Sequence, residues 1–294
     1  MEISEYKNIF ENEETHFFYR ANHNIILSLV KKYLSHETDL KAKSKQPIAI
    51  LDAGCGTGLL ARKLAKFGKV YAIDISCQAV KYSRQRKVNA IKASITKIPF
   101  SSNFFDLVIS NDVIYHKKVA NDITALSEMY RVLKDKGILI LRVPAIKWLA
   151  TNHDKFVHTR ERYSKNSLLE KLTKSGFQVE KLFYTNLLLV PVALVLHLGN
   201  VMTFSPPLEG GVSLLKENDI SGSIHPRTKV RGFLETAINK SQPKSGVVPT
   251  SKILNEIFYL LLLFESRLSK VIDFPLGLGL MAVCRKPSKR SGLP

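Results

Sequence analysis

Residues 47–58 read PIAILDAGCGTG and carry the strongest structural signal in the chain. The apolar first half, which ends in small residues, is typical of a strand buried on both faces of a parallel sheet. Gly54, Gly56 and Gly58 then lead into LLARKLAKFG, whose final Gly68 is typical of a helix C-terminus. Glycine permits a tight turn and lets a ligand approach the backbone closely. The stretch therefore predicts a strand, a ligand-binding turn and a helix.

Strand and helix patterns continue to alternate beyond this unit. VYAID, residues 70–74, is a second strand candidate, and Ser76 is a candidate N-cap for a helix that ends near Lys87. Further strand candidates are NAIKAS (89–94), FFDLVIS (104–110), GILILRVPA (137–145), FQVEKLFYT (177–185) and GLGLMAVCRK (277–286). Such alternation favours a doubly wound, mostly parallel sheet with right-handed connections. We therefore expect an α/β fold with a seven-stranded Rossmann-like sheet.

Two segments differ from this alternating core. Residues 25–34 place apolar side chains on one helical face, and the polar run Glu37 to Gln46 then interrupts that pattern. Before the last strand candidate, 187–196 and 257–264 are apolar runs, while 205–251 is rich in Pro, Gly, Ser and Lys. Neither apolar run reaches the roughly 20 residues of a membrane-spanning helix. We expect a helical cap (1–46), a ligand-binding core (47–186), an insertion that contacts substrate or membrane (187–273), and a final core strand with a tail (274–294).

Composition indicates the partners and the compartment. The chain has 44 Lys and Arg residues against 25 Asp and Glu, a net charge of +19. Such a surplus attracts polyanions, so phosphates and an anionic membrane surface are plausible neighbours. Three cysteines without CxxC or zinc-ligand spacing argue against a disulfide scaffold and a structural zinc, and we expect no metal. The acidic N-terminal segment lacks an apolar stretch, which indicates the cytoplasm.

Asp74 narrows the class of ligand. It lies at the tip of the second predicted strand, where its carboxylate could accept hydrogen bonds from both hydroxyls of a ribose. NAD and S-adenosylmethionine (SAM) both contain such a ribose. The dinucleotide fingerprint places a third glycine three residues after the second, a position that Leu59 holds here. The distance to the acid does not discriminate, because Asp74 lies 20 residues after Gly54.

Four motifs in order resemble the class I SAM-dependent methyltransferases. They are Asp52 to Gly58, Asp74, Ile98-Pro99-Phe100, and Phe105-Asp106-Leu107-Val108. The resemblance covers roughly Pro47 to Ala145 and implies the methyltransferase form of the Rossmann-like fold, with SAM as the cofactor.

The same resemblance implies a set of cofactor-binding residues. They are Asp52, Gly54, Cys55, Gly56 and Gly58 in the glycine loop, Asp74 and Ile75 after the second strand, Ser94 and Ile95 after the third, and Ser110 and Asn111 after the fourth. Asp52 and Gly54 would line the methionine end, Asp74 would bind the ribose, and Ile75 would pack on the adenine. The family usually has Asp where this chain has Ser94, and a hydroxyl lacks the carboxylate's charge.

The flanks resemble methyltransferases that are often encoded among polysaccharide or lipid-linked glycan functions. Those proteins commonly have His-Asp, a later His and then Arg-Arg-Tyr, and here Glu161 replaces the first of those arginines. His153, Asp154 and His158 are candidate catalytic residues, since transfer to a hydroxyl uses a base near the acceptor oxygen. His116 is a fourth candidate. The alternatives are that these residues cap a helix or pack, and that methyl transfer needs no strong base.

We therefore expect a SAM-dependent methyltransferase that acts on an oxygen or nitrogen of a small or lipid-linked acceptor, related to glycans. The charge and the apolar runs favour peripheral attachment at the inner face of the membrane. One alternative is a non-catalytic scaffold at a membrane. A nucleic-acid methyltransferase is disfavoured, because Ser110 to Val113 reads SNDV rather than an Asn/Asp-Pro-Pro-Tyr segment, and no Pro-Cys nucleophile is present.

Overall fold

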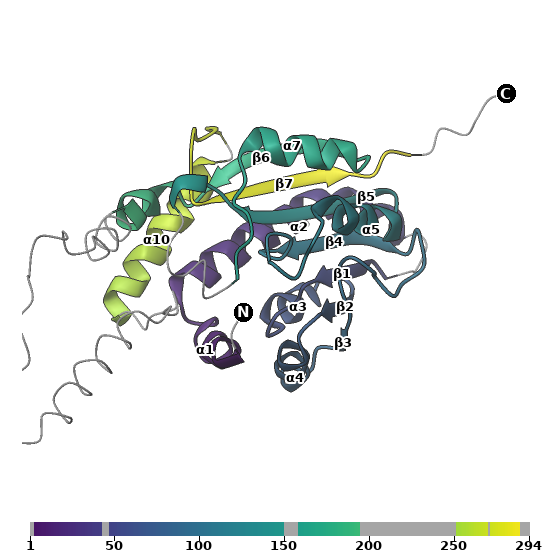
Figure 1. The fold of residues 1–294 in the computed structure, drawn as a ribbon, viewed down its shortest axis with the longest axis horizontal. Helices are drawn as coiled ribbons and strands as arrows, with labels where there is room; N and C mark the ends of the chain where they lie inside the picture. The colour runs from purple at the N-terminus through teal and green to yellow at the C-terminus, as the bar shows by residue number, and fades with distance from the viewer. Residues whose placement is uncertain (1–2, 43–46, 150–157, 195–250, 270, 289–294) are drawn as a thin grey trace, which may run out of the picture.

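A seven-stranded sheet forms the centre of the molecule (Figure 1). The computed structural model describes residues 3–42, 47–149, 158–194, 251–269 and 271–288. The strands are β1 (Ala49–Ala53), β2 (Lys69–Asp74), β3 (Ala90–Lys92), β4 (Phe105–Asn111), β5 (Leu133–Pro144), β6 (Gln178–Thr185) and β7 (Gly279–Arg285). Their order is β3-β2-β1-β4-β5-β7-β6. The first five are parallel, and β7 is antiparallel to both neighbours. The predicted α/β, Rossmann-like sheet is confirmed.

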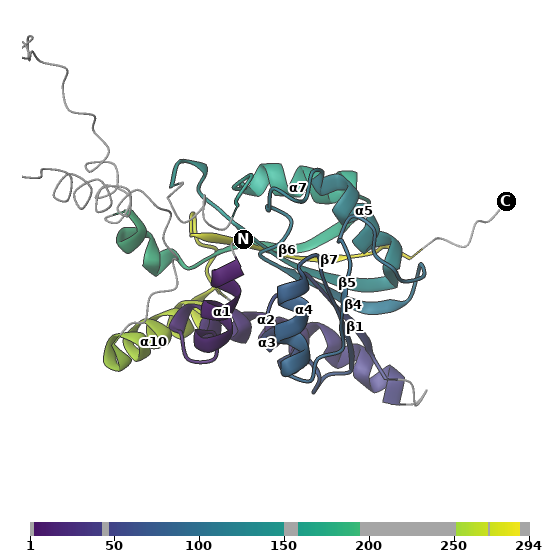
Figure 2. The ribbon, with the colours of Figure 1, turned by 60° about the horizontal axis from the view of Figure 1, so that its bottom comes forward.

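Helices cover both faces of this sheet (Figures 1 and 2). The α-helices are α1 (Ile3–Asn12), α2 (Phe17–Ala42), α3 (Leu59–Leu64), α4 (Cys77–Gln85), α5 (Asp122–Val132), α7 (Lys165–Lys174) and α10 (Lys252–Leu268), and the short 3-10 turns are η1 (Lys147–Leu149) and η2 (Leu187–Leu189). The helix α2 continues to Ala42, so the end of the apolar pattern at Glu37 is not the end of the helix. Polar residues such as Lys and Glu favour helix, and neither Gly nor Pro occurs before Pro47 to end it.

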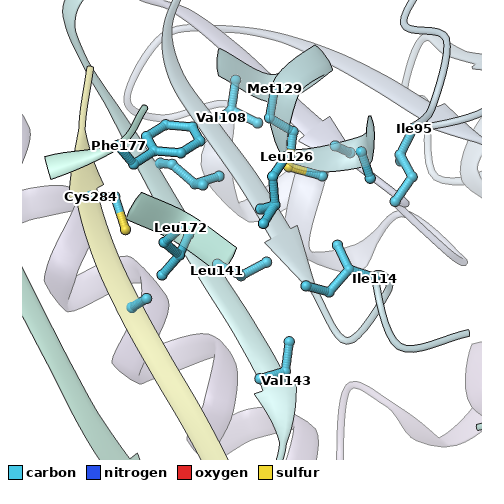
Figure 3. Packing of buried hydrophobic residues seen from close by; sticks show 14 of the residues in the cluster. Ile95, Val108, Ile114, Leu126, Met129, Leu141, Val143, Leu172, Phe177 and Cys284 are labelled. Carbon is cyan, nitrogen blue, oxygen red and sulfur yellow. The ribbon is translucent and has the colours of Figure 1, made fainter. Parts of the chain in front are cut away.

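Alternating side chains of the strands build two cores. Ile50 and Leu107 face α2 and α3, whereas Leu51 and Val108 face α5 and α7. Figure 3 shows the second core, where Val108 and Leu141 of the sheet meet helix residues such as Leu126 and Met129 of α5. Because both sheet faces are buried, the strands read as continuous apolar runs, as the sequence predicted.

Two helices lie where the parallel strands end. α1 packs on α4, with the Phe10 and Tyr82 ring centroids 4.7 Å apart. α10 lies along the first half of α2, where the Asn24 amide donates to the Tyr259 hydroxyl at 2.7 Å. Within the described residues no helix combines the length and apolar character needed to cross a bilayer. The four-part division of the chain stays a prediction, and residues 195–250 of the insertion lie outside the described residues.

Candidate functional site

A cavity of about 570 Å³ opens at the carboxyl edge of the parallel strands. Loops after β1, β2, β3 and β4 form one half of its wall, and α1, α2, η2 and α10 contribute to the other half. Nine of the predicted cofactor-binding residues line it, namely Asp52, Gly54, Cys55, Gly56, Asp74, Ile75, Ser94, Ile95 and Asn111. Gly58 and Ser110 are not among the lining residues. The Ser110 hydroxyl is buried and donates to the Ala53 carbonyl at 3.2 Å.

The three glycines of the loop have different roles. All three have positive φ, which favours glycine. A Cβ on Gly54 would lie 2.3 Å from a Val113 methyl group, and one on Gly58 would lie 2.8 Å from the Ser83 hydroxyl. A Cβ on Gly56 would meet nothing within 4 Å. The absence of a side chain at Gly54 therefore lets the loop after β4 pack closely, and the absence of one at Gly58 does the same for α4. Gly56 leaves space beside the cavity.

Asp74 holds the glycine loop in shape. One carboxylate oxygen accepts from the Gly56 amide at 3.0 Å and the other from the Ser76 amide at 2.8 Å. Burial raises the pKa of Asp74, while these two hydrogen bonds lower it. Each carboxylate oxygen has a second lone pair, so Asp74 keeps acceptor capacity toward the cavity that it lines.

Asp52 and Asn111 supply unpaired acceptors at the same edge. Each has a buried side-chain oxygen, Oδ2 of Asp52 and Oδ1 of Asn111, that accepts no hydrogen bond within the described part of the chain. Burial, with Asp74 and Glu13 nearby, raises the pKa of Asp52 to about 7. A buried acceptor without a partner is costly, so a ligand with cationic donors would be stabilised here. With the space at Gly56, these oxygens fit the amino-acid end of SAM.

The Ser94 hydroxyl is engaged within its own loop. It lies 2.8 Å from the Thr96 hydroxyl and accepts from the Thr96 amide at 3.2 Å. Ile75, an exposed apolar side chain, lies at the cavity wall, and buried Ile95 lines it as well. The adenine contacts of Ser94, Ile75 and Ile95 stay predictions.

The helix α1 and the residues after it to Glu14 form an N-terminal latch that closes one side of the cavity. The contacts of this latch were not predicted from the sequence. Glu13 accepts a hydrogen bond from Thr57 of the glycine loop and pairs with Arg86 at 3.0 Å. Arg86 also donates to the Phe10 carbonyl at 2.7 Å, and Arg62 donates to Glu14 at 2.7 Å. Burial raises the pKa of Glu13 to about 7. The helical spacing of Ile3, Tyr6, Ile9 and Phe10 was the available signal for α1.

Known proteins were compared with this chain. A family model described as "Methyltransferase domain" matches residues 51–141. An uncharacterized protein of Methanocaldococcus jannaschii is 30% identical over 171 residues, which cover 57% of this chain and 67% of that protein. This chain belongs to the class I SAM-dependent methyltransferases. SAM is therefore its cofactor. The glycine loop and Asp74 line one half of the cavity, which we call the cofactor half because the family resemblance assigns these residues to SAM.

Two named enzymes each match 31% of this methyltransferase. A ubiquinone/menaquinone biosynthesis C-methyltransferase of Coxiella burnetii is 31% identical over 104 residues, which cover 31% of this chain and 41% of that protein. A malonyl-[acyl-carrier protein] O-methyltransferase of Enterobacter lignolyticus is 37% identical over 93 residues, 31% of this chain and 36% of that one. A solved structure of a putative sarcosine dimethylglycine methyltransferase from Galdieria sulphuraria has 17% identity and a TM-score of 0.47, over 88% of this chain and 86% of that chain. This chain thus spans less than half the length of the two named enzymes.

The predicted catalytic residues of the methyltransferase separate into two groups. His153 and Asp154 lie outside the described residues. His116 and His158 lie together, with ring centroids 5.7 Å apart, but only His116 lines the cavity. The His116 Nδ1 atom accepts from the Lys118 amide at 3.1 Å, and burial lowers the pKa of His116 to about 4. His116 is therefore neutral near pH 7.

The Arg-Arg-Tyr segment of the family pattern packs around Asp122. The Tyr163 hydroxyl donates to Asp122 at 2.8 Å, and Arg160 and Lys171 pair with the same carboxylate. Lys171 also pairs with Glu161 at 2.8 Å. Glu161 therefore belongs to a structural network, which supports the packing alternative for this segment.

An ion pair lies between the two halves of the cavity, with Arg142 buried and Asp112 half-buried. Arg142 of β5 pairs with Asp112, which follows β4 in a left-handed conformation. The Arg142 guanidinium also lies 5.2 Å from the centroid of the Phe18 ring. An arginine inside the apolar run ILILRVP was the available signal for this site, because a charge in a buried strand needs a partner.

The second half of the cavity is mainly apolar. Its lining includes Phe17, Phe18 and Tyr19 of α2, Leu189 of η2, Phe258 of α10, and Leu278 before β7. Phe17 and Phe258 have ring centroids 5.1 Å apart. Arg162 also lines the cavity and donates to the Ala145 carbonyl at 2.8 Å. We call this half the acceptor half.

Proposed function

We propose that this methyltransferase transfers the methyl group of SAM to an oxygen or nitrogen of a small or lipid-linked acceptor, related to glycans. The single observation that carries the proposal is the continuity of one cavity from the glycine loop to the acceptor half. Rate acceleration by orientation needs donor and acceptor side by side in one enclosed space. The apolar lining from α2, η2 and α10 supports an acceptor with an apolar part.

Each residue has a role that follows from its contacts. Asp74 would bind the ribose hydroxyls, while Asp52 and Asn111 would accept from the ammonium of the methionine end. The bound cofactor supplies a methyl group already activated by its sulfonium. The latch of α1 excludes water from the cofactor half, because Glu13 holds it on Thr57. His116 is neutral above pH of about 4, and its Nδ1 accepts from the Lys118 amide, so the ring proton lies on Nε2 and would orient an acceptor heteroatom by a hydrogen bond.

The relatives leave the acceptor atom open. One named enzyme is a C-methyltransferase and the other an O-methyltransferase. We favour oxygen or nitrogen, because the Nε2–H of His116 at the cavity wall would donate to such an atom. Glu161 stands where the related methyltransferases have arginine, which was one reason to consider a non-catalytic scaffold. Its ion pair with Lys171 accounts for this difference.

Asp74→Ala tests the cofactor site. We expect the Kd for SAM, measured by calorimetry, to rise by about tenfold or more, because two charge-assisted hydrogen bonds to the ribose are lost. Asp74→Asn keeps one acceptor and should lose less affinity. Circular dichroism confirms that both variants remain folded. An unchanged Kd in Asp74→Ala would contradict the assignment.

The acceptor is identified with labelled cofactor. The protein is incubated with SAM that carries a radioactive methyl group and with fractionated cell extract. We expect label in the lipid or glycan fraction and none in nucleic acid. Label confined to nucleic acid would overturn the acceptor class, and no label in any fraction would overturn the enzyme proposal.

A further inference from the structure

The outer face of α10 is an apolar surface without a described partner. Eleven of the fifteen exposed large apolar side chains among the described residues lie between Leu188 and Leu276. On α10 they are Ile253, Leu254, Ile257, Leu260, Leu261 and Phe264. Leu260 is 61% exposed and Phe264 58%. Scattered single apolar residues are ordinary on a surface, whereas a contiguous set marks an interaction site.

Helix geometry places these side chains on one stripe. At 3.6 residues per turn, Ile253, Ile257, Leu260 and Phe264 fall within an arc of about 60°. Leu254 and Leu261 adjoin that stripe. The buried residues Asn255 and Leu262 lie on the opposite side, and buried Glu265 lies about 110° from the middle of the stripe. An exposed apolar stripe of this kind is a candidate for cover by a partner.

The inner side of α10 is fully engaged with the protein. The Asn255 amide donates to the Thr15 carbonyl at 2.9 Å, and its oxygen accepts from the Phe17 amide at 2.8 Å. Glu265 accepts from the Leu187 and Leu188 amides at 3.0 Å each. The helix is therefore fixed in orientation, and the outer stripe stays exposed.

Basic residues lie at both ends of the stripe. Arg267, which is exposed, adjoins the apolar arc near the end of α10, and exposed Lys252 lies at the start of the helix, about 80° outside the arc. Two acids of the helix are already paired within the protein, Glu256 with Arg20 and Glu265 with backbone amides. Asp273 is an exposed acid beyond the helix. With the net charge of +19, this border is complementary to an anionic surface.

We propose that the outer face of α10 is a docking surface for an anionic lipid bilayer, with the helix lying in the plane of the headgroups. An apolar stripe bordered by cations is the arrangement that binds such an interface. Leu188 and Val192 beside α10, and Val271, Ile272 and Leu276 after it, extend the apolar surface. The elements lie together at one end of the molecule (Figures 1 and 2).

Docking would bring the acceptor half of the cavity to the bilayer. Phe258, on the side of α10 toward α2, lines that half, as do Val192 and Ala193. An amphiphilic acceptor would then enter the cavity from the membrane without crossing bulk water. This step rests on the proposed function, whereas the docking itself does not.

Vesicle flotation tests the proposal. The full chain is mixed with vesicles of phosphatidylglycerol and phosphatidylcholine, or of phosphatidylcholine alone. The test variant is Leu260→Glu with Phe264→Glu, and the matched control is Leu169→Glu on α7, where the leucine is 42% exposed. We expect the wild type and the control to float with anionic vesicles, and the test variant to lose roughly tenfold or more in partitioning. Higher ionic strength should weaken the binding.

Three results would overturn docking. The first is a wild type that does not float with anionic vesicles. The second is a test variant that floats as the wild type does. The third is a wild-type dimer in light scattering that the same substitutions dissociate, without flotation of either protein. The last result would assign the surface to a second copy. SAM affinity, measured for all three proteins, confirms the fold of each variant. Flotation without SAM binding would support docking while the proposed function fails.

Discussion

Gly56 and Gly58 are two residues apart and differ in what surrounds them. Gly56→Ala adds a methyl group in open space beside the cavity, at a cost of about 1–2 kcal/mol for the left-handed backbone. We expect this variant to fold and to bind SAM about tenfold or more weakly, since the methyl group takes space from the ligand. Gly58→Ala should lose more stability, by about 2–4 kcal/mol, because of the contact with Ser83. Urea unfolding and calorimetry measure the two effects, and equal losses of stability would contradict this division of roles.

Glu13 gives the latch a dependence on pH. Burial raises its pKa from 4.5 to about 7, against the opposing influence of Thr57, Arg86 and Lys63. Between pH 4.5 and about 7 the folded state holds more protons than the unfolded state. The free energy of unfolding therefore falls as the pH rises, and the destabilisation by the buried charge of Glu13 is fully present above pH of about 7.

Glu13→Gln should remove this slope. We expect the difference in stability between wild type and variant to change by about 1–3 kcal/mol across the window. Urea unfolding at several pH values measures it, with Glu11→Gln, an exposed position of α1, as the control. Parallel pH profiles for wild type and Glu13→Gln would show that the carboxyl keeps an ordinary pKa.

At the scale of elements, buried strands were predictable and their ends were not. Each of the seven strands lies within or across its predicted range, because burial on both faces leaves an apolar run that is legible in one sequence. The edge strand β3 is only three residues long, whereas the other edge strand, β6, has eight. A helical cap was expected over 1–46, but the contacts of α1 were not predicted, because they depend on Arg86 and Tyr82 from a distant part of the chain.

Asp122 joins three elements and should matter for stability rather than for cofactor binding. Its carboxylate holds Arg160, Tyr163 and Lys171, so Asp122→Ala leaves cationic groups without their partner. We expect a loss of about 3–5 kcal/mol in urea unfolding, with the Kd for SAM unchanged in the folded protein. Glu170→Ala, which removes an exposed ion pair on α7, should change nothing measurable. A fall in SAM affinity with full stability would contradict the structural role.

At the scale of the whole molecule, the cofactor should stabilise the fold. SAM would contact the loops that follow several strands and would lie under α1. Only the folded chain brings these parts together, so only the folded chain binds SAM. At a concentration about 100 times the Kd, SAM should raise the free energy of unfolding by about 2.7 kcal/mol. Thermal unfolding with and without SAM measures the shift, and Asp74→Ala should need more SAM for the same effect. A melting temperature that does not change when SAM is added would contradict the assignment of the cofactor site.

The cofactor half of the site was more predictable than the acceptor half. The glycine loop and Asp74 are adjacent to strands that the sequence reveals, and nine of eleven predicted residues line the cavity. The acceptor half joins Phe18 of α2 and Phe258 of α10, which are separated by more than two hundred residues in sequence. Only tertiary packing brings such residues together.

The position of β7 between β5 and β6 has a consequence for synthesis. β6 pairs with β7 alone, and the two strands are separated by the whole insertion. A nascent chain that has left the ribosome as far as Thr185 therefore carries β6 without a partner, with its backbone groups open to other chains. The sheet closes only when Gly279–Arg285 has emerged and entered the gap. The strand that completes the core is thus made after the whole insertion, and a ribosome stalled within the insertion would hold an aggregation-prone intermediate.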